Sequence, residues 1–356
     1  MTDTHDPRTD GPRPADARPV DMQPVGTRPV GAQPSDTQLA DFEQHRRMVF
    51  GIAYRMLGSV ADAEDLVQDT WLRWSRVTGP VAGPAGFLAR TVTNLALNRL
   101  DSAVVRREAY VGPWLPEPLV TEPDATDGVE RAETVSLALL VLLENLSPLE
   151  RAVFVLKEAF AFSYQEIAEA LDRTEVACRQ IGSRARAHVR ARRPRYDAPP
   201  ELRRRATDEF LAACVGGDLN RMLELLAPDV TTWSDGGGVI RAALRPVTGA
   251  ENVARFTLGV LRQLGEGAAA HPVLVNGEAG LLVTVDGAVD SVSVFDFVEG
   301  PDGTPLISAI RAVRNPHKLG HLAGPAPAAH PAPAADAAPA AEPAPAADAA
   351  PGADPA

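Results

Sequence analysis

Residues 163–193 read SYQEIAEALDRTEVACRQIGSRARAHVRARR, and their spacing decides the fold of the middle of the chain. Ser163, followed three residues later by Glu166, forms a capping box that opens a short helix. A tight turn at Asp172 follows, and Thr174 can cap a second helix. Two short helices joined by a tight turn are typical of a helix-turn-helix.

The second of these helices has an apolar side and a basic side, because side chains repeat at about 100° per residue. The apolar side consists of Ala177, Ile181, Ala185 and Val189, and the opposite side of Arg179, Ser183, Arg186 and Arg190. A basic helix face is usually just solvated, but its coincidence with the cap and the turn favours DNA binding, since arginine binds phosphate or guanine bidentately. Gly182 costs this helix up to ~1 kcal/mol against alanine, so we expect it to permit a close helix approach. A helix-turn-helix alone leaves repressor, activator and initiation factor open.

The chain has 356 residues and a formal net charge of −12, with a pI near 5.1. Because acidic residues gather outside the arginine-rich helix, this net charge does not exclude a nucleic-acid partner. Cys178 and Cys214 are far apart and form no CxxC pair, so we expect no disulfide, no metal and no cofactor. No apolar run approaches the ~18 residues of a membrane span, and the N-terminus lacks a signal-peptide core. We therefore expect a soluble cytoplasmic protein without a membrane partner.

Composition divides the chain into six segments. Proline-rich and alanine-rich sequence without a hydrophobic period predicts disorder at both ends. Between the ends lie two helical blocks, an acidic linker, and a block in which two helical patterns precede β-branched runs, which predicts an α+β domain. The expected segments are 1–38 (disordered extension), 39–108 (all-α domain), 109–129 (Pro-rich linker), 130–195 (helix-turn-helix domain), 201–322 (α+β domain) and 323–356 (disordered tail).

Residues 62–74, DAEDLVQDTWLRW, form an amphipathic helical pattern with carboxylates in its first turn, where the helix dipole favours them. The inward stripe consists of Ala63, Leu66, Val67, Thr70 and Trp74. The outward set consists of Asp65, Gln68, Asp69, Leu72 and Arg73. Periodicity alone is equally consistent with an ordinary helix that has a solvated charged face.

The longer phrase FGIAYRMLGSVADAEDLVQDTWLRW, residues 50–74, resembles region two of the bacterial extracytoplasmic-function (ECF) sigma factors, the smallest group of the sigma-70 family. The resemblance implies that the outward set binds the coiled coil of the RNA polymerase beta-prime subunit. The helix-turn-helix resembles region four, which reads the −35 promoter element, and the beta flap of the core is a further implied partner. The implied −35 contacts are Thr174, Arg179, Gln180, Ser183, Arg184, Arg186 and Arg190.

Residues 84–108, PAGFLARTVTNLALNRLDSAVVRRE, fall where that family reads and melts the −10 element. The resemblance implies DNA contacts here, because asparagine can pair with adenine edges or with a flipped-out base. The implied contacts are Asn94, Asn98 and Arg99 on the outward side of a helix, and Arg106 and Arg107 for phosphates. Alternatively, these polar residues only make the helix soluble.

The C-terminal block, 201–322, resembles the SnoaL-like α+β cone, a curved sheet wrapped around a helix and a pocket that also hosts polyketide cyclases and isomerases. Such an enzyme needs an acid/base pair in its pocket. The candidates Asp235, Asp296, Trp233, Arg245 and His271 show no spacing that marks them as catalytic. The cone can also hold a small-molecule ligand, since fold does not fix activity.

Three phrases resemble signatures of the ECF subfamily that carries this domain: WLPEP (114–118), DGGG (235–238) and NPHKL (315–319), the last usually with Asp where His317 stands. The resemblance implies that DGGG and NPHKL touch the sigma core and tune its activity, and that WLPEP takes part in the same regulation. The implied contact residues are Trp114, Leu115, Pro116, Glu117, Pro118, Asp235, Gly236, Gly237, Gly238, Asn315, Pro316, Lys318 and Leu319.

We therefore predict a promoter-specificity subunit of RNA polymerase, not an enzyme, whose own C-terminal domain modulates its activity. Three alternatives remain open: a stand-alone helix-turn-helix repressor, a SnoaL-like cyclase or isomerase with a DNA-binding appendage, and a cytoplasmic scaffold. Deleting residues 40–107 would spare operator binding by a repressor. Turnover by residues 201–322 alone would reveal an enzyme.

Overall fold

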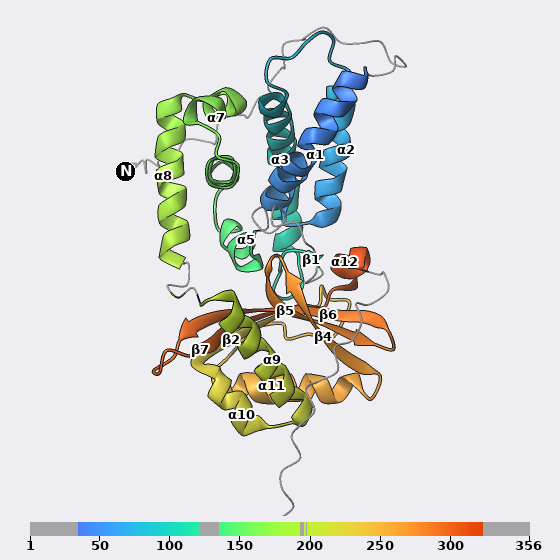
Figure 1. Ribbon diagram of the computed structural model, residues 1–356, viewed down its shortest axis with the longest axis vertical. Coiled ribbons are helices and arrows are strands. Elements are labelled where there is room, and N and C mark those ends of the chain that lie inside the picture. Colours follow the sequence, from blue (N-terminus) through green and yellow to red (C-terminus); the bar gives the residue numbers. More distant parts are fainter. Residues whose placement is uncertain (1–34, 122–134, 193–195, 197, 323–356) are drawn as a thin grey trace, which may run out of the picture. The chain divides into compact units, whose positions relative to one another are not determined.

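The computed structural model describes residues 35–121, 135–192, 196 and 198–322, with the side chains of 101–108 and 121 excepted. These residues fall into two compact units (Figure 1). The first unit draws on residues up to 57, on 61–101 and on 148–185, and the second on 58–60, 102–147 and the residues from 186 onward.

The first unit is helical. Its elements are α1 (Asp36–Leu57), α2 (Val60–Trp74), most of α3 (Pro84–Glu108), α6 (Pro148–Phe154), a π-helix (Val155–Ala159), α7 (Tyr164–Leu171) and most of α8 (Glu175–Arg192). Helix α1 starts within the segment expected to be disordered, because Ser35 and Gln38 form a reciprocal capping box at its first turn. Trp74 joins three helices: its indole N–H donates to the Gln38 carbonyl at 2.8 Å, and its ring lies 5.3 Å from that of Phe87.

The second unit contains a short helix α5 (Leu137–Leu143) and an α+β domain, which confirms the predicted fold class. The helices of the domain are α9 (Pro200–Gly216), α10 (Leu219–Leu225), α11 (Ala250–Leu264) and α12 (Pro316–Leu319), followed by a 3-10 turn (Gly320–Leu322). The strands are β1 (Val120–Thr121), β2 (Leu226–Asp235), β3 (Val247–Thr248), β4 (Ala268–Val275), β5 (Glu278–Val285), β6 (Ala288–Glu299) and β7 (Pro305–Val313). They form one sheet in the order β1-β4-β5-β6-β7-β2-β3, in which only the β2–β7 pair is parallel. None of the helices in the described ranges is long and apolar enough to cross a membrane.

Helices α9, α10 and α11 cover one face of this sheet (Figure 1). Apolar side chains from both layers fill the space between them, and Phe210 of α9 meets Phe295 of β6 edge-on, with ring centroids 5.7 Å apart. Aromatic pairs prefer such tilted contacts. The helix-covered side of the sheet is therefore a packed core.

The opposite face of the sheet is also buried. Leu282, Val292, Val313 and Asp235 are successive cross-strand partners and form one row across β5, β6, β7 and β2. They alternate with residues of the helix-side core and so point away from it. At the edge, the linker supplies β1, in which Val120 pairs with Val275 of β4. Here the linker is an integral part of the C-terminal fold.

Candidate polymerase, DNA and linker contacts

Helix α2 has the predicted two-sided burial. All five residues of the inward stripe are buried, and all five residues of the outward set are exposed, including Leu72 with 50% of its surface accessible. A single exposed leucine is common on protein surfaces and does not by itself mark an interface. The burial pattern is confirmed, and the role of the outward set stays a prediction.

The helix-turn-helix also folds as its local signals predict. Ser163 and Glu166 make the full capping box, and these hydrogen bonds lower the pKa of the Glu166 carboxyl. Asp172 ends α7 in the left-handed conformation, and the Thr174 hydroxyl accepts the Ala177 N–H at 3.2 Å to open α8. The buried side of α8 consists of Cys178, Ile181, Ala185 and Val189, with Ala177 half-buried.

The predicted −35 contacts form the open side of α8. Thr174, Arg179, Gln180, Ser183, Arg184 and Arg190 are exposed, and Arg186 is half-buried. The guanidinium of Arg179 pairs with Glu175 one turn earlier and lies 5.4 Å over the ring of Tyr164. This arginine is therefore held in place by α7 and by its own helix.

Gly182 lies at a close approach between helices, as expected from a glycine that destabilises its own helix. A Cβ at this position would lie 2.8 Å from the Tyr164 hydroxyl and 3.3 Å from the Cγ1 of Val153. Both contacts are tighter than ordinary van der Waals approach, so a side chain at this position would force Tyr164 and Val153 to shift where α8 packs on α7 and α6.

The −10 segment of α3 is less open than predicted. Among the predicted contacts whose side chains the structure describes, Asn98 is exposed. Asn94 is half-buried, and its amide donates to the Ala170 carbonyl of α7 at 3.3 Å. Arg99 is half-buried as well and forms ion pairs with α2. The role of these residues as −10 contacts stays a prediction. The side chains of Arg106 and Arg107 lie outside the described residues.

Arg99 is bound by two carboxylates of α2. Its Nη2 lies 2.6 Å from Asp62 Oδ1 and 2.8 Å from Asp65 Oδ2, and its Nε lies 3.0 Å from Asp62 Oδ1. Desolvation opposes the charge, but the hydrogen bonds and charges of the two aspartates outweigh it and raise the pKa of the guanidinium. Arg99 thus ties the −10 segment to the first turns of α2.

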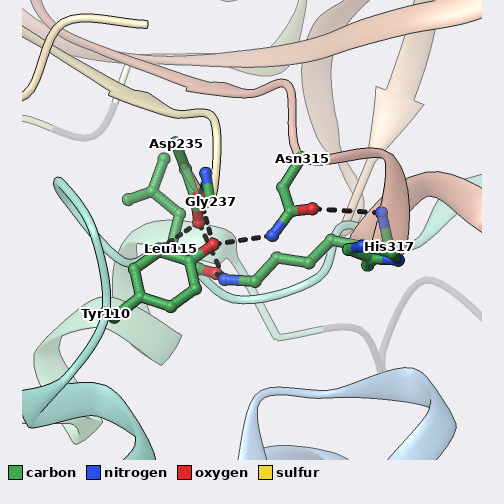
Figure 2. Close-up of polar contacts among 7 residues, drawn as sticks. Tyr110, Leu115, Asp235, Gly237, Asn315 and His317 are labelled. Carbon is green, nitrogen blue, oxygen red and sulfur yellow. Dashed lines mark hydrogen bonds and ion pairs between the residues drawn. The ribbon is translucent and has the colours of Figure 1, made fainter. Parts of the chain in front are cut away.

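The linker is held to the sheet by one fully buried carboxylate, that of Asp235 at the end of β2 (Figure 2). Its Oδ1 accepts hydrogen bonds from the Tyr110 hydroxyl at 2.5 Å and the Gly237 N–H at 3.1 Å. Its Oδ2 accepts from the Leu115 N–H at 2.8 Å and from the Lys318 ammonium at 2.7 Å. These donors offset the cost of burying the charge.

Lys318 completes the junction. It also donates to the Leu115 carbonyl, and its Nζ lies 4.2 Å from the Trp114 ring and 4.8 Å from the Tyr110 ring. Such cation–π contacts stabilise a desolvated ammonium. The three phrases WLPEP, DGGG and NPHKL therefore meet at one point, and their implied contact with the sigma core stays a prediction. Sequence reasoning missed Tyr110, because no period or motif marks it.

Asn315 fixes the far side of this junction (Figure 2). Its Nδ2 donates to the Tyr110 hydroxyl at 2.8 Å, and its Oδ1 accepts the His317 N–H at 3.0 Å. His317 contributes only its main chain, and its side chain is exposed, so the usual Asp is not needed at this position for the junction. Gly237 has φ +61°, and a Cβ there would lie 2.2 Å from Asn315 Nδ2, which explains the glycine.

The remaining phrase residues lie around this junction. Pro116, Glu117, Pro118, Gly236 and Leu319 are buried, whereas Gly238 and Pro316 are exposed. The Pro118 carbonyl lies 2.8 Å from Nε2 of His321. The linker is anchored again beyond WLPEP, where Asn276 accepts the Leu119 N–H and donates to the Val135 carbonyl, each at 3.0 Å.

The candidate catalytic residues take part in several different contacts. Asp296 pairs with Arg311 at 2.6 Å, and Arg311 lies over Trp233. Nε2 of His271 is 3.2 Å from the Thr284 hydroxyl, and Arg245 is exposed in the loop after β2. Across the described ranges, no group of three His, Cys, Asp or Glu residues is placed to hold a metal ion.

Comparison with known proteins identifies the two helical regions. Residues 42–104 match the family model for Sigma-70 region 2, and residues 136–189 match that for Sigma-70, region 4. The ECF RNA polymerase sigma factor SigJ of Mycobacterium tuberculosis is 40% identical over 292 residues, which are 79% of this chain and 93% of SigJ. The probable ECF RNA polymerase sigma factor SigI of the same species is 33% identical over 73% of this chain and 89% of SigI.

The crystal structure of SigJ superposes with a TM-score of 0.64 at 36% identity, covering 79% of this chain and 98% of that one. A sigma region 2, a helix-turn-helix region 4 and a C-terminal α+β domain thus occur in the same order in a chain of known structure. The chain belongs to the ECF RNA polymerase sigma factors of the sigma-70 family. Its function is to direct promoter-specific initiation of transcription.

Proposed function

We propose that three helical surfaces divide this function between them. The exposed outward set of α2 docks on the beta-prime coiled coil, α3 engages and opens the −10 element, and the arginine side of α8 enters the −35 major groove while region 4 meets the beta flap. The observation that carries the proposal is the polar, exposed side of α8, which is the second helix of a fully formed helix-turn-helix. The boundaries 39–108, 109–129, 130–195 and 201–322 then separate docking, linker, reading and regulatory segments in the cytoplasm, where the polymerase works.

The free chain binds DNA poorly in this proposal, because region 4 is packed on region 2. Arg151 of α6 is 2% exposed and donates to the Met56 carbonyl at the end of α1, at 2.7 Å. The ring of Phe160 lies 5.0 Å from the guanidinium carbon of Arg55. Together with the bond from Asn94 to α7, these contacts support a closed unit that polymerase must open before both promoter elements can be bound.

The C-terminal domain is proposed to regulate and not to catalyse. Apolar side chains fill its helix-covered side, and the candidate acid and base groups are engaged in separate contacts. The buried Asp235–Lys318 pair, with 0% and 8% of the side chains exposed, instead clamps the linker that joins the two sigma regions. A domain that holds this linker can set how far region 4 separates from region 2.

Run-off transcription tests both claims. Purified core polymerase is supplied with the full chain or with a 1–196 truncation, on the promoter upstream of the chain's own gene. Promoter-specific transcripts with either form are expected, at different levels, while core binding persists. Equal transcription from both forms would refute regulation by the C-terminal domain. No transcript and no core binding would refute the assigned sigma surfaces.

A further inference from the structure

The linker also contacts the turn that precedes α2, and the Asp235–Lys318 clamp does not account for this contact. The Glu117 carboxylate accepts the main-chain N–H of Val60 through Oε2 at 2.7 Å. Its own N–H donates to the Gly58 carbonyl at 2.9 Å. Val60 is the first residue of α2, and Glu117 is 8% exposed. A buried carboxylate from the linker thus lies at the N-terminus of the docking helix.

This position suits a carboxylate for two physical reasons. The first N–H groups of an α-helix have no partner within the helix, so an acceptor from elsewhere stabilises the first turn. The helix dipole places partial positive charge at the same end and attracts an anion. Glu117 therefore acts as a cap that is supplied from 57 positions away in the chain.

The cap is mechanically joined to the C-terminal domain. Leu115, two residues before Glu117, gives its N–H to Asp235 and its carbonyl to Lys318. The stretch from Leu115 to Pro118 is buried throughout. We therefore expect a displacement of Leu115 to displace Glu117 as well. Loss of the Asp235–Lys318 clamp would release Leu115 and, with it, the carboxylate on Val60.

We propose that Glu117 is a positioning residue through which the C-terminal domain controls the docking helix. While the clamp is closed, Glu117 caps α2 and fixes its first turns, and core binding is favoured. When the clamp opens, the cap is lost and docking weakens. The inference rests on the proposed docking role of α2. It implies that the C-terminal domain strengthens binding to core polymerase.

A double-mutant cycle on the full chain tests this route. Core polymerase affinity is measured for Glu117→Ala, Asp235→Asn and the double variant. Glu117→Ala is expected to weaken core binding about three- to tenfold, the effect of losing one helix cap. Asp235→Asn is expected to weaken it as well, and the double variant no more than the stronger single one. Glu117→Gln, which keeps an acceptor, recovers most of the loss.

Hydrogen exchange gives a second readout. The Val60 N–H should exchange faster in Asp235→Asn, although Asp235 does not contact it. Glu251→Ala, which removes an exposed carboxylate of α11, is the control and should change neither measurement. Additive losses in the cycle would overturn the route through Glu117, and so would unchanged core affinity in Glu117→Ala.

The docking proposal can fail separately. Asp69→Arg reverses a charge in the outward set of α2 and leaves Glu117 untouched. If Asp69→Arg abolishes core binding while Glu117→Ala does not affect it, only the capping role is refuted. If neither variant affects core binding, α2 is not the docking helix, and both proposals fall.

Discussion

Replacing Lys318 with methionine should loosen the linker at Leu115, where it is bound to the C-terminal domain. Removing one partner of a buried ion pair costs about 3–5 kcal/mol, because the other charge is left uncompensated. Asp235 would keep three donors, the Tyr110 hydroxyl and the N–H groups of Leu115 and Gly237, so we expect the lower end, ~3 kcal/mol. At ~2–4 °C per kcal/mol for a unit of this size, the unfolding temperature of the second unit should fall by ~6–12 °C.

Calorimetry on the full chain measures this fall, and hydrogen exchange at the Leu115 N–H reports the linker directly. The matched control is Arg314→Met. Arg314 pairs with Asp290 at 2.8 Å on the same sheet, with 13% and 15% of the side chains exposed. Its side chain also donates to the Arg241 carbonyl. The control should lower the unfolding temperature and leave Leu115 protected.

The reasoning fails if Lys318→Met and Arg314→Met give the same exchange rate at Leu115. In that case the three remaining donors to Asp235 would suffice to hold the linker, and the lysine would only neutralise charge. Faster exchange at Leu115 in Lys318→Met alone would establish the ammonium as the anchor.

Three further predictions concern other parts of the chain. Asp69→Arg should weaken binding to core polymerase at least tenfold in a pull-down titration, whereas Asp65→Arg is a poorer probe because Asp65 also holds Arg99. Gly182→Ala should destabilise the helix-turn-helix by about 1–3 kcal/mol through overpacking, and adding Tyr164→Phe should recover part of this loss by removing the hydroxyl that a Cβ would meet. No recovery would place the clash at the Tyr164 ring carbon Cε1 or at Val153, which lie 3.1 and 3.3 Å from that Cβ. Burial, then the hydrogen bond to Asp235, raises the pKa of Tyr110, so its contribution to stability is complete below the ordinary tyrosine pKa of ~10 and is lost as pH rises beyond it. Alkaline unfolding monitored by calorimetry should show this slope in the wild type and not in Tyr110→Phe.

Local signals account for what could be predicted from the sequence. The two sides of α2 follow from helical periodicity, and α7 and α8 from a capping box, a turn and a second cap, each within a few residues of its partner. The α+β class of the C-terminal block follows from the change of period alone. In each case the information lies within one turn or one strand, where neighbouring side chains decide the outcome.

The partners of outward-facing residues could not be predicted, because they come from distant parts of the chain. Tyr110 bonds Asp235 across 125 positions, and Asn94 bonds Ala170 across 76. A helical wheel places Asn94 outward, but it does not say whether another helix lies there. The capping box of α1 was local and therefore predictable; it was missed because Pro-rich sequence precedes it.

The contacts of α3 bear on how this sigma factor meets a promoter. Asp62 and Asp65 occupy the Nε and Nη2 donors of Arg99, so these donors reach the −10 element, as proposed, only if they leave the two carboxylates. For Asn94 to reach a base, α7 must leave α3. The contacts of Arg99 and Asn94 oppose both changes in the free chain, and under the proposed function both changes follow when polymerase engages α2 and separates region 4. The affinity of the free chain for promoter DNA should therefore be low, and mutating Arg99 should affect the holoenzyme and the isolated chain by different factors.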